Sequence, residues 1–79
     1  MDEKLKLLYD HIGDILYIET VPPYPGQRSE ELADEVIARI NPTTDAIEGI
    51  EVLFFSRRTQ RDSALELPVA ALLRLSDPG

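Results

Sequence analysis

Three consecutive large apolar side chains, Leu53, Phe54 and Phe55, constrain the fold of this 79-residue chain more than any other feature. They end a predicted strand over residues 47–55, and neighbouring side chains on a strand project to opposite faces of a sheet. Both faces of this strand therefore need a cover. A chain this short buries only about 60% of the surface that its unfolded form exposes, so it has few elements for that cover. We expect one small domain, residues 1–79, that relies on a second subunit.

Alternation of apolar and polar residues with a period of two predicts the strands of the sheet. The predicted strands cover residues 4–9, 15–20, 35–41 and 47–55. Residues 28–34 fit either a short edge strand or a single helical turn capped by Ser29. We favour the edge strand, because position 32 is Leu and the capping box that would support a helix is incomplete.

The C-terminal part carries weaker signals. Residues 56–62 contain no hydrophobic side chain, which is typical of a loop or one surface turn of helix. Leu65, Leu67 and Val69 then alternate as in a last strand, and residues 70–75 fit a short helix. The expected fold is mainly β, in the small α+β class: an antiparallel meander sheet of four or five strands with a short C-terminal helical segment.

The apolar faces of strands 35–41 and 47–55 predict how these two strands pair. The faces coincide only when the numbers of opposite residues add to an even sum, which is called parity here. Placing the two apolar faces together puts Ala38 opposite Ile50 or Val52, and it puts Arg39 on the same face as Glu51. We expect the Glu51 carboxylate to lie at the sheet surface or to pair with Arg39. Because residues three apart on a strand project to opposite faces, Glu51 should not converge with Glu48, which lies three positions earlier.

Composition narrows the classes of function. Fifteen acidic residues against eight basic ones give a net charge of −7, which opposes the counterion release that drives nucleic-acid binding. A basic protein partner suits such a surface better. The absence of cysteine excludes disulfides, thiolate metal sites and cysteine nucleophiles.

No apolar run approaches the roughly 18 residues of a membrane span, and the N-terminus lacks the pattern of a secretion signal. We therefore expect a cytoplasmic protein without a membrane partner. No glycine-rich nucleotide loop or other cofactor motif is present, and we predict neither a cofactor nor a catalytic residue.

Four sequence segments together resemble a known family. They are Tyr9-Asp10, residues 14–18, residues 49–53 and residues 55–58. In this order and spacing they are similar to the small prokaryotic proteins catalogued as domain of unknown function 2283, over about residues 5–58. The resemblance implies a compact β-rich fold. It also implies, from members encoded beside small toxin-like proteins, an antitoxin-like partner role.

Two turn positions depart from the pattern of that family. Asp45 and Glu35 stand where the family often has glycine. Asp accommodates a left-handed backbone reasonably well, whereas Glu does so poorly. We therefore expect the turn at Glu35 to differ from the usual one.

Two clusters deserve a chemical interpretation. Asp10 and Asp14 flank the only histidine, and carboxylate oxygens can bind divalent ions, but their spacing matches neither a zinc site nor a calcium loop. We interpret them as turn-stabilising side chains and keep, as the alternative, a small-ligand- or metal-binding enzyme that uses Asp10, Asp14 and Glu51.

The second cluster is basic. Arg57, Arg58 and Arg61 could clamp a phosphate or an acidic segment of another protein. A solvated loop that offsets the acidic surface is the interpretation that we favour.

These observations together predict a non-catalytic, homodimeric protein-interaction module. One copy is too short to cover both apolar faces of its sheet, and a second copy could pack sheet against sheet or continue the sheet at its edge. The predicted interface residues are Leu16, Ile18, Leu53 and Phe55.

Overall fold

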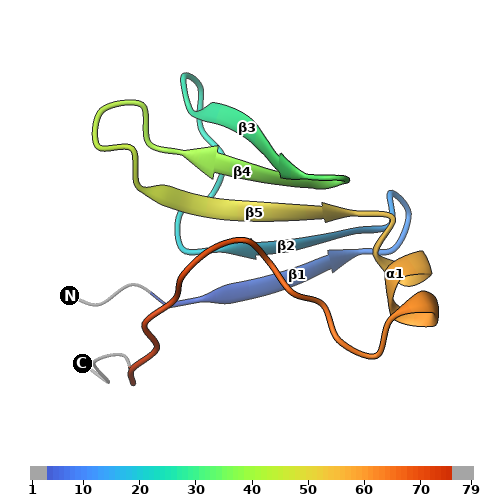
Figure 1. Cartoon of the computed structure of the whole chain (residues 1–79). Coiled ribbons are helices and arrows are strands. Elements are labelled where there is room, and N and C mark those ends of the chain that lie inside the picture. The colour runs from blue at the N-terminus through green and yellow to red at the C-terminus, as the bar shows by residue number, and fades with distance from the viewer. Residues whose placement is uncertain (1–3, 76–79) are drawn as a thin grey trace.

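The computed structural model describes residues 4–75 and shows one antiparallel sheet of five strands followed by a short helix (Figure 1). The elements are β1 Lys6–Asp10, β2 Ile15–Glu19, β3 Arg28–Ala33, β4 Val36–Ile40, β5 Ile47–Leu53 and α1 Phe55–Arg61. The predicted mainly-β fold, with four or five antiparallel strands and a short helix, is confirmed, and the sheet has five strands. The ambiguous segment is the edge strand β3.

The strands lie in the order β1-β2-β5-β4-β3. Strands β3, β4 and β5 follow one another as a meander, and β2 pairs with β5 on the far side. The connection from β2 to β3 must therefore pass β5 and β4 (Figure 1). Three prolines stiffen this connection, at residues 22, 23 and 25.

The register of the central hairpin agrees with the parity argument. Ala38 lies opposite Ile50, and Arg39 lies opposite Gly49. The register then shifts, so that Ile40 pairs with Ile47 and one extra residue, Glu48, is accommodated on β5. Such a bulge bends a strand and redirects the side chain at the extra position.

One face of the sheet, here called the covered face, holds the core. Val36, Ile50 and Val52 are its buried cluster. Partly buried side chains pack against this cluster from β2, β3, α1 and the C-terminal tail, residues 62–75; they are Leu16, Ile18, Leu32, Phe55, Leu65, Leu67 and Val69. Figure 1 shows the tail running across the sheet on this side.

The expected strand at Leu65–Val69 and the expected helix over residues 70–75 are wrong. The tail has no regular secondary structure, and the helix lies at residues 55–61 instead. The alternation nevertheless reports burial, because Leu65 and Val69 are half-buried while the intervening Glu66 is exposed. Pro68 lacks the backbone donor that a strand ladder would need at its position, and the side chains of Leu65, Leu67 and Val69 pack against the core cluster.

The predicted strand also extends two residues too far. Strand β5 ends at Leu53, and Phe54 adopts a left-handed backbone with φ of 53°. This turn leaves Phe54 42% exposed and carries Phe55 to the covered face, where its ring lies 5.7 Å from that of Tyr9. Simple alternation predicted that Phe55 shares the face of Leu53. That prediction is wrong, because the two side chains lie on opposite faces of the sheet.

The turn between β3 and β4 stores backbone strain at Glu35, which has φ of 63°. A left-handed backbone costs a non-glycine residue about 1–2 kcal/mol. Replacing Glu35 with glycine should therefore raise the free energy of unfolding by about 1 kcal/mol, after allowance for the greater freedom of glycine in the unfolded chain. Urea unfolding followed by circular dichroism measures this change.

The matched control for this prediction is Glu35→Ala. Alanine removes the carboxylate and its 3.9 Å contact with Arg58, but it keeps the Cβ atom that causes the strain. It should not stabilise the protein. Equal stabilisation by both substitutions would attribute the effect to the lost carboxylate and contradict the argument from strain.

Candidate interaction surface on the open face of the sheet

The opposite side of the sheet, here called the open face, is built from three rows of side chains that cross the strands. The register aligns Lys6, Glu19, Gly49 and Arg39 in the first row, Leu8, Tyr17, Glu51 and Ile37 in the second, and Asp10, Ile15 and Leu53 in the third. The first row is polar, whereas the other two are mainly apolar. The open face therefore has a polar end and an apolar end.

The apolar end keeps much of its surface in contact with solvent. Ile15, Tyr17, Ile37 and Leu53 are half-buried, and Leu8 is 50% exposed. The core contacts of α1 and of the tail are all with the covered face. A group of neighbouring apolar side chains that stays accessible is typical of a protein-interaction surface.

At the polar end, Arg39 is buried between two carboxylates. Only 4% of Arg39 and 6% of Glu19 is exposed, and an Nη2 atom of Arg39 lies 2.6 Å from Oε1 of Glu19. The Nε atom lies 3.1 Å from Oε2 of Glu51, at an angle that makes an ion-pair contact but no hydrogen bond. The pairing of Arg39 with Glu51 agrees with the expectation from sequence.

Gly49 provides the space for this guanidinium. A Cβ atom built on Gly49 would overlap Nη2 of Arg39. Any larger residue at this position would therefore displace Arg39 from Glu19. The absence of a side chain at Gly49 was the available sequence signal that something lies above the strand there.

The crossing connection between β2 and β3 closes over the polar end. Gln27 accepts a hydrogen bond from Arg39 at 3.4 Å and donates one to Glu48 at 3.1 Å. The Glu48 carboxylate also accepts bonds from the Tyr24 hydroxyl at 2.6 Å and the Asn41 amide at 3.1 Å. Alternation predicted no connection between Glu48 and Glu51, but the bulge joins them in one network through Gln27 and Arg39.

These donors shift two pKa values. The Tyr24 hydroxyl bond, supported by the amides of Gln27 and Asn41 and by the charge of Arg39, holds the pKa of Glu48 below its ordinary value. The same bond raises the pKa of Tyr24, because the phenolate would face a carboxylate. Both shifts favour the charge state seen in the network at neutral pH.

Asp14 connects the β1–β2 turn to the start of α1. Its carboxylate accepts bonds from the Tyr9 hydroxyl at 2.7 Å and from the backbone and hydroxyl of Ser56 at 3.0 and 2.7 Å. The helix has no cap from its own N-cap residue, Phe54, so Asp14 satisfies a free amide from a distant part of the chain. These donors lower the pKa of Asp14, and the bond to the Asp14 carboxylate raises the pKa of Tyr9.

A pH dependence of stability follows from Asp14 and Glu48. Each has a lower pKa in the folded chain than in the unfolded chain, so each contributes stability that is complete above the ordinary carboxyl pKa of about 4. That contribution is lost as the pH falls below about 4 and through the lowered values. Urea unfolding at a series of pH values between neutral and strongly acidic conditions will show a steep decrease.

Asp14→Asn should flatten this acid limb, because the amide no longer titrates, while it also lowers stability at neutral pH. Glu31→Gln, an exposed carboxylate on β3, is the control and should leave the pH profile as it is. An unchanged acid limb in Asp14→Asn would show that Asp14 does not contribute to it.

The residues of the metal hypothesis do not converge. Asp10 accepts bonds from the backbone amides of Ile12 and Gly13 and shapes the β1–β2 turn, as expected for a turn aspartate. Asp14 accepts hydrogen bonds from Tyr9 and Ser56. Glu51, in the middle of β5, contacts Arg39 of β4. Within residues 4–75, no group of three or more His, Cys, Asp or Glu side chains could hold a metal ion.

The three arginines of the basic cluster have different neighbours. Arg57 lies over the ring of Phe54 at 5.1 Å, and Arg61 lies 3.7 Å from Asp62. Arg58 donates to the backbone oxygen of Asp34 and lies 3.9 Å from Glu35. Arg58 and Arg61 line one pocket that Arg57 does not line. Contact of the three arginines with an anion or an acidic partner stays a prediction.

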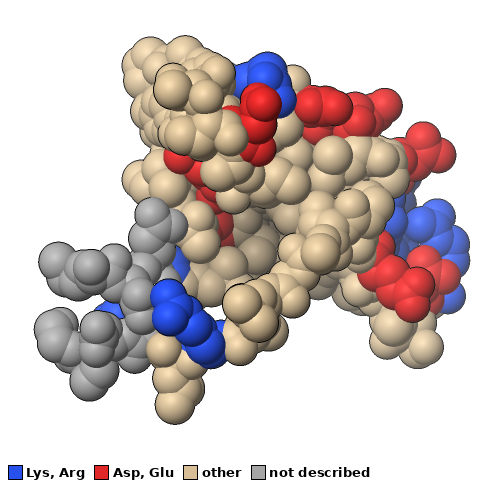
Figure 2. All heavy atoms as spheres, turned by 60° about the vertical axis from the view of Figure 1, so that its left-hand side comes forward, with Lys and Arg blue, Asp and Glu red and all other residues tan. Residues whose placement is uncertain are grey.

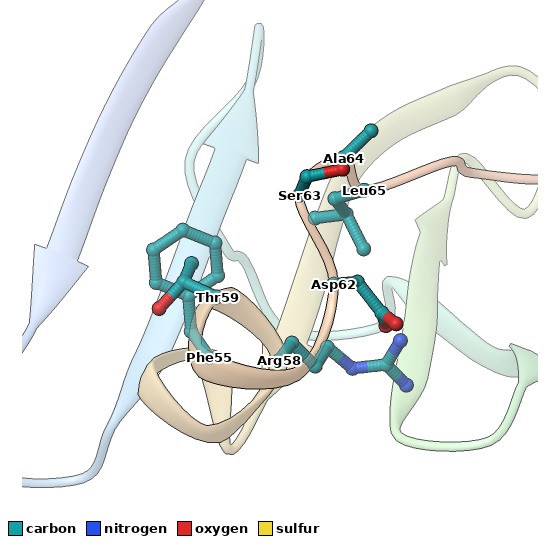
Figure 3. A pocket seen from close by; sticks show the side chains of 7 residues that line it. All are labelled: Phe55, Arg58, Thr59, Asp62, Ser63, Ala64 and Leu65. Carbon is teal, nitrogen blue, oxygen red and sulfur yellow. The ribbon is translucent and has the colours of Figure 1, made fainter.

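Beside Arg58 the chain forms a shallow pocket of about 200 Å³ (Figure 3). Its lining residues are Phe55, Arg58, Thr59, Asp62, Ser63, Ala64 and Leu65. Figure 3 shows that they come from α1 and the start of the tail, with the guanidinium and the Asp62 carboxylate on the same side. The pocket therefore places a positive and a negative side chain next to each other.

The four predicted interface residues are divided between the two faces. Leu16, Ile18 and Phe55 pack against the core cluster on the covered face. Leu53 lies on the open face, in register with Ile15. The open face also carries Tyr17 and Ile37, which were not among the predicted interface residues.

Charged side chains are distributed in groups. In Figure 2 acidic side chains gather along the upper and right-hand parts of the view, with basic ones beside some of them. On β3, Glu30 and Glu31 are exposed together. The net charge of −7 therefore includes local acidic regions, which a basic partner would complement.

Comparison with known proteins supports the resemblance seen in the sequence. Residues 6–56 match the family described as "Protein of unknown function (DUF2283)". The chain belongs to this family. No curated protein and no solved structure matches the chain.

The DUF2283 match runs from β1 to the first turn of α1, so it includes the whole sheet. It ends before the tail, although the tail supplies Leu65, Leu67 and Val69 to the covered face. The open face and its polar end therefore belong to the family region, whereas part of the core cover is outside it.

Among the described residues, no helix has the length and apolar character to cross a membrane.

Proposed function

We propose that this DUF2283 protein is a non-catalytic, homodimeric protein-interaction module, and that the open face binds the partner. One observation carries the proposal: the chain covers one face of its sheet with its own tail and leaves the apolar end of the other accessible. Fully burying a side chain such as Leu53 or Tyr17 is worth about 1.5–3 kcal/mol. Because both side chains are already half-buried, a partner on this face would gain part of that free energy.

The partner that fits best is a small basic protein, as in an antitoxin-like pair. The chain has almost twice as many acidic as basic residues, 15 against 8, so electrostatic attraction would favour a basic surface. Its carboxylates at Asp14, Glu19, Glu48 and Glu51 are held by hydrogen bonds or ion pairs within the fold. That engagement favours a structural role for them over catalysis.

Purification from the native host tests the partner. A tagged chain should recover one small basic protein in a fixed ratio, and Ile37→Lys on the open face should abolish this recovery. Gln60→Lys, the same type of substitution at an exposed position of α1, should leave it intact. Recovery that survives Ile37→Lys in a folded variant, or recovery of no basic protein at all, would contradict the proposal.

Size-exclusion chromatography with light scattering tests the homodimer. We expect twice the mass of one chain at micromolar concentration. A mass of one chain at every accessible concentration would remove the homodimer from the proposal.

A further inference from the structure

The two edges of the sheet have opposite character. Strand β3 carries exposed Glu30 and Glu31, and its pairing with β4 shifts between Glu31 and Ala33. Charges and bulges are the usual protection of an edge strand against pairing with another chain. Strand β1 forms the other edge and pairs regularly with β2 over all five residues.

Strand β1 presents apolar side chains instead. Leu7 is 61% exposed, Leu8 50% and Tyr9 42%. A regular, apolar edge strand offers a row of backbone groups for another strand. The remaining question is which strand fits it.

The sequence of β1 is complementary to itself. When Lys6–Asp10 is paired antiparallel with a second copy about its centre, Leu8 lies opposite Leu8 of the second copy. Leu7 then faces Tyr9, and Lys6 faces Asp10, so that an apolar core of the pairing is flanked by two pairs of opposite charges. The equivalent pairing of β3 would bring glutamate against glutamate, which is destabilising.

We propose that two copies of this chain associate through antiparallel pairing of their β1 strands, with Leu8 on the two-fold axis. This inference rests on the homodimer proposed above and specifies how it forms. The two sheets become one continuous sheet of ten strands. Because Leu8 belongs to the open face, the second rows of the two open faces then meet and form one wider surface for a partner.

Cysteine cross-linking tests the register, because the chain has no cysteine of its own. Directly opposed residues on antiparallel strands have Cα atoms about 4.5–5.5 Å apart, which is within the range that a disulfide spans. Leu8→Cys should therefore form a disulfide-linked dimer under mild oxidation, measured by non-reducing electrophoresis.

Two control variants define the expected specificity. Leu7→Cys places the thiols two residues out of register, and Glu30→Cys places one on the other edge. Leu8→Cys should cross-link at least about tenfold faster than either, because pairing raises the effective concentration of its thiol. Equal rates in the three variants, or faster cross-linking of Leu7→Cys or Glu30→Cys, would overturn the proposed pairing.

A charge variant provides an independent test that does not depend on cysteine. Lys6→Glu sets a carboxylate against Asp10 of the second copy and should weaken the dimer by about tenfold or more in light scattering, whereas Lys6→Arg should preserve it. A dimer that is insensitive to Lys6→Glu and does not cross-link at Leu8→Cys refutes β1 pairing but leaves the homodimer. A monomeric wild-type chain refutes both.

Discussion

Replacing Arg39 with alanine will lower the free energy of unfolding by about 3–5 kcal/mol, the cost of leaving a buried ion-pair partner without its counter-charge. Glu19 is only 6% exposed and has Arg39 at 2.6 Å. Without the guanidinium its carboxylate would be buried without a counter-charge. Glu51 and Gln27 lose a contact as well. Urea unfolding at neutral pH measures the loss.

The control for Arg39 is an ion pair on the surface of the same sheet. Arg28 lies 3.0 Å from Asp45, and their side chains are 47% and 74% exposed. Arg28→Ala should therefore cost no more than about 1 kcal/mol, because solvent screens the pair. A similar loss in both variants would mean that burial of Arg39 adds nothing to its contribution.

Gly49→Ala should disturb the same ion-pair network from the strand beneath Arg39. The new Cβ atom would meet the guanidinium of Arg39 and displace it from Glu19. We expect this substitution to destabilise the protein in the same direction as Arg39→Ala, and the effects of the two should not add when combined.

Ending the chain at Asp62 will produce the second large effect, a loss of about 3–5 kcal/mol. The truncation removes Leu65, Leu67 and Val69, which are half-buried against the core cluster, and it exposes the apolar atoms beneath them. A chain of this size has about 4–12 kcal/mol of total stability. The truncated chain should therefore unfold at much lower urea concentration or lose its cooperative transition.

A shorter truncation separates this contact from an effect of length. A chain that ends at Ala71 keeps all three packing residues and loses Leu72 and Leu73, which are 91% and 79% exposed. It should lose less than about 1 kcal/mol. If truncation at Asp62 leaves the midpoint of unfolding unchanged, the tail does not stabilise the covered face.

Much of the sheet could be predicted from local pattern. Alternation located four strands to within two residues. Parity limited the partner of Ala38 to Ile50 or Val52, of which the structure has Ile50, and it placed Arg39 on the face of Glu51. These predictions succeed because the side-chain period of a strand is two, so that a slip of one residue would bury charges. The turn role of Asp10 followed in the same way from the bonds that its side chain makes within three residues.

The site could be predicted only in part. Pairing with Arg39 was one of the two expected positions of the Glu51 carboxylate, and the structure has it. The approach of Glu19, Tyr24 and Gln27 was not predicted. Their approach depends on the connection that crosses from β2 to β3, and no local pattern encodes where a long connection passes. The bulge at Glu48 was missed for a related reason, because an extra residue in one strand is defined only against its partner.

By itself, the sequence determined the strands, their pairing across the central hairpin, and an excess of apolar side chains over what one face of a sheet can bury. Those properties depend on contacts between near neighbours and on composition. The tertiary structure alone decided which face is covered. The left-handed turn at Phe54 directs Phe55 and the tail to the covered face. The chain turns there and does not continue as a strand, because the turn lets Phe55 and the tail pack against residues distant in the sequence.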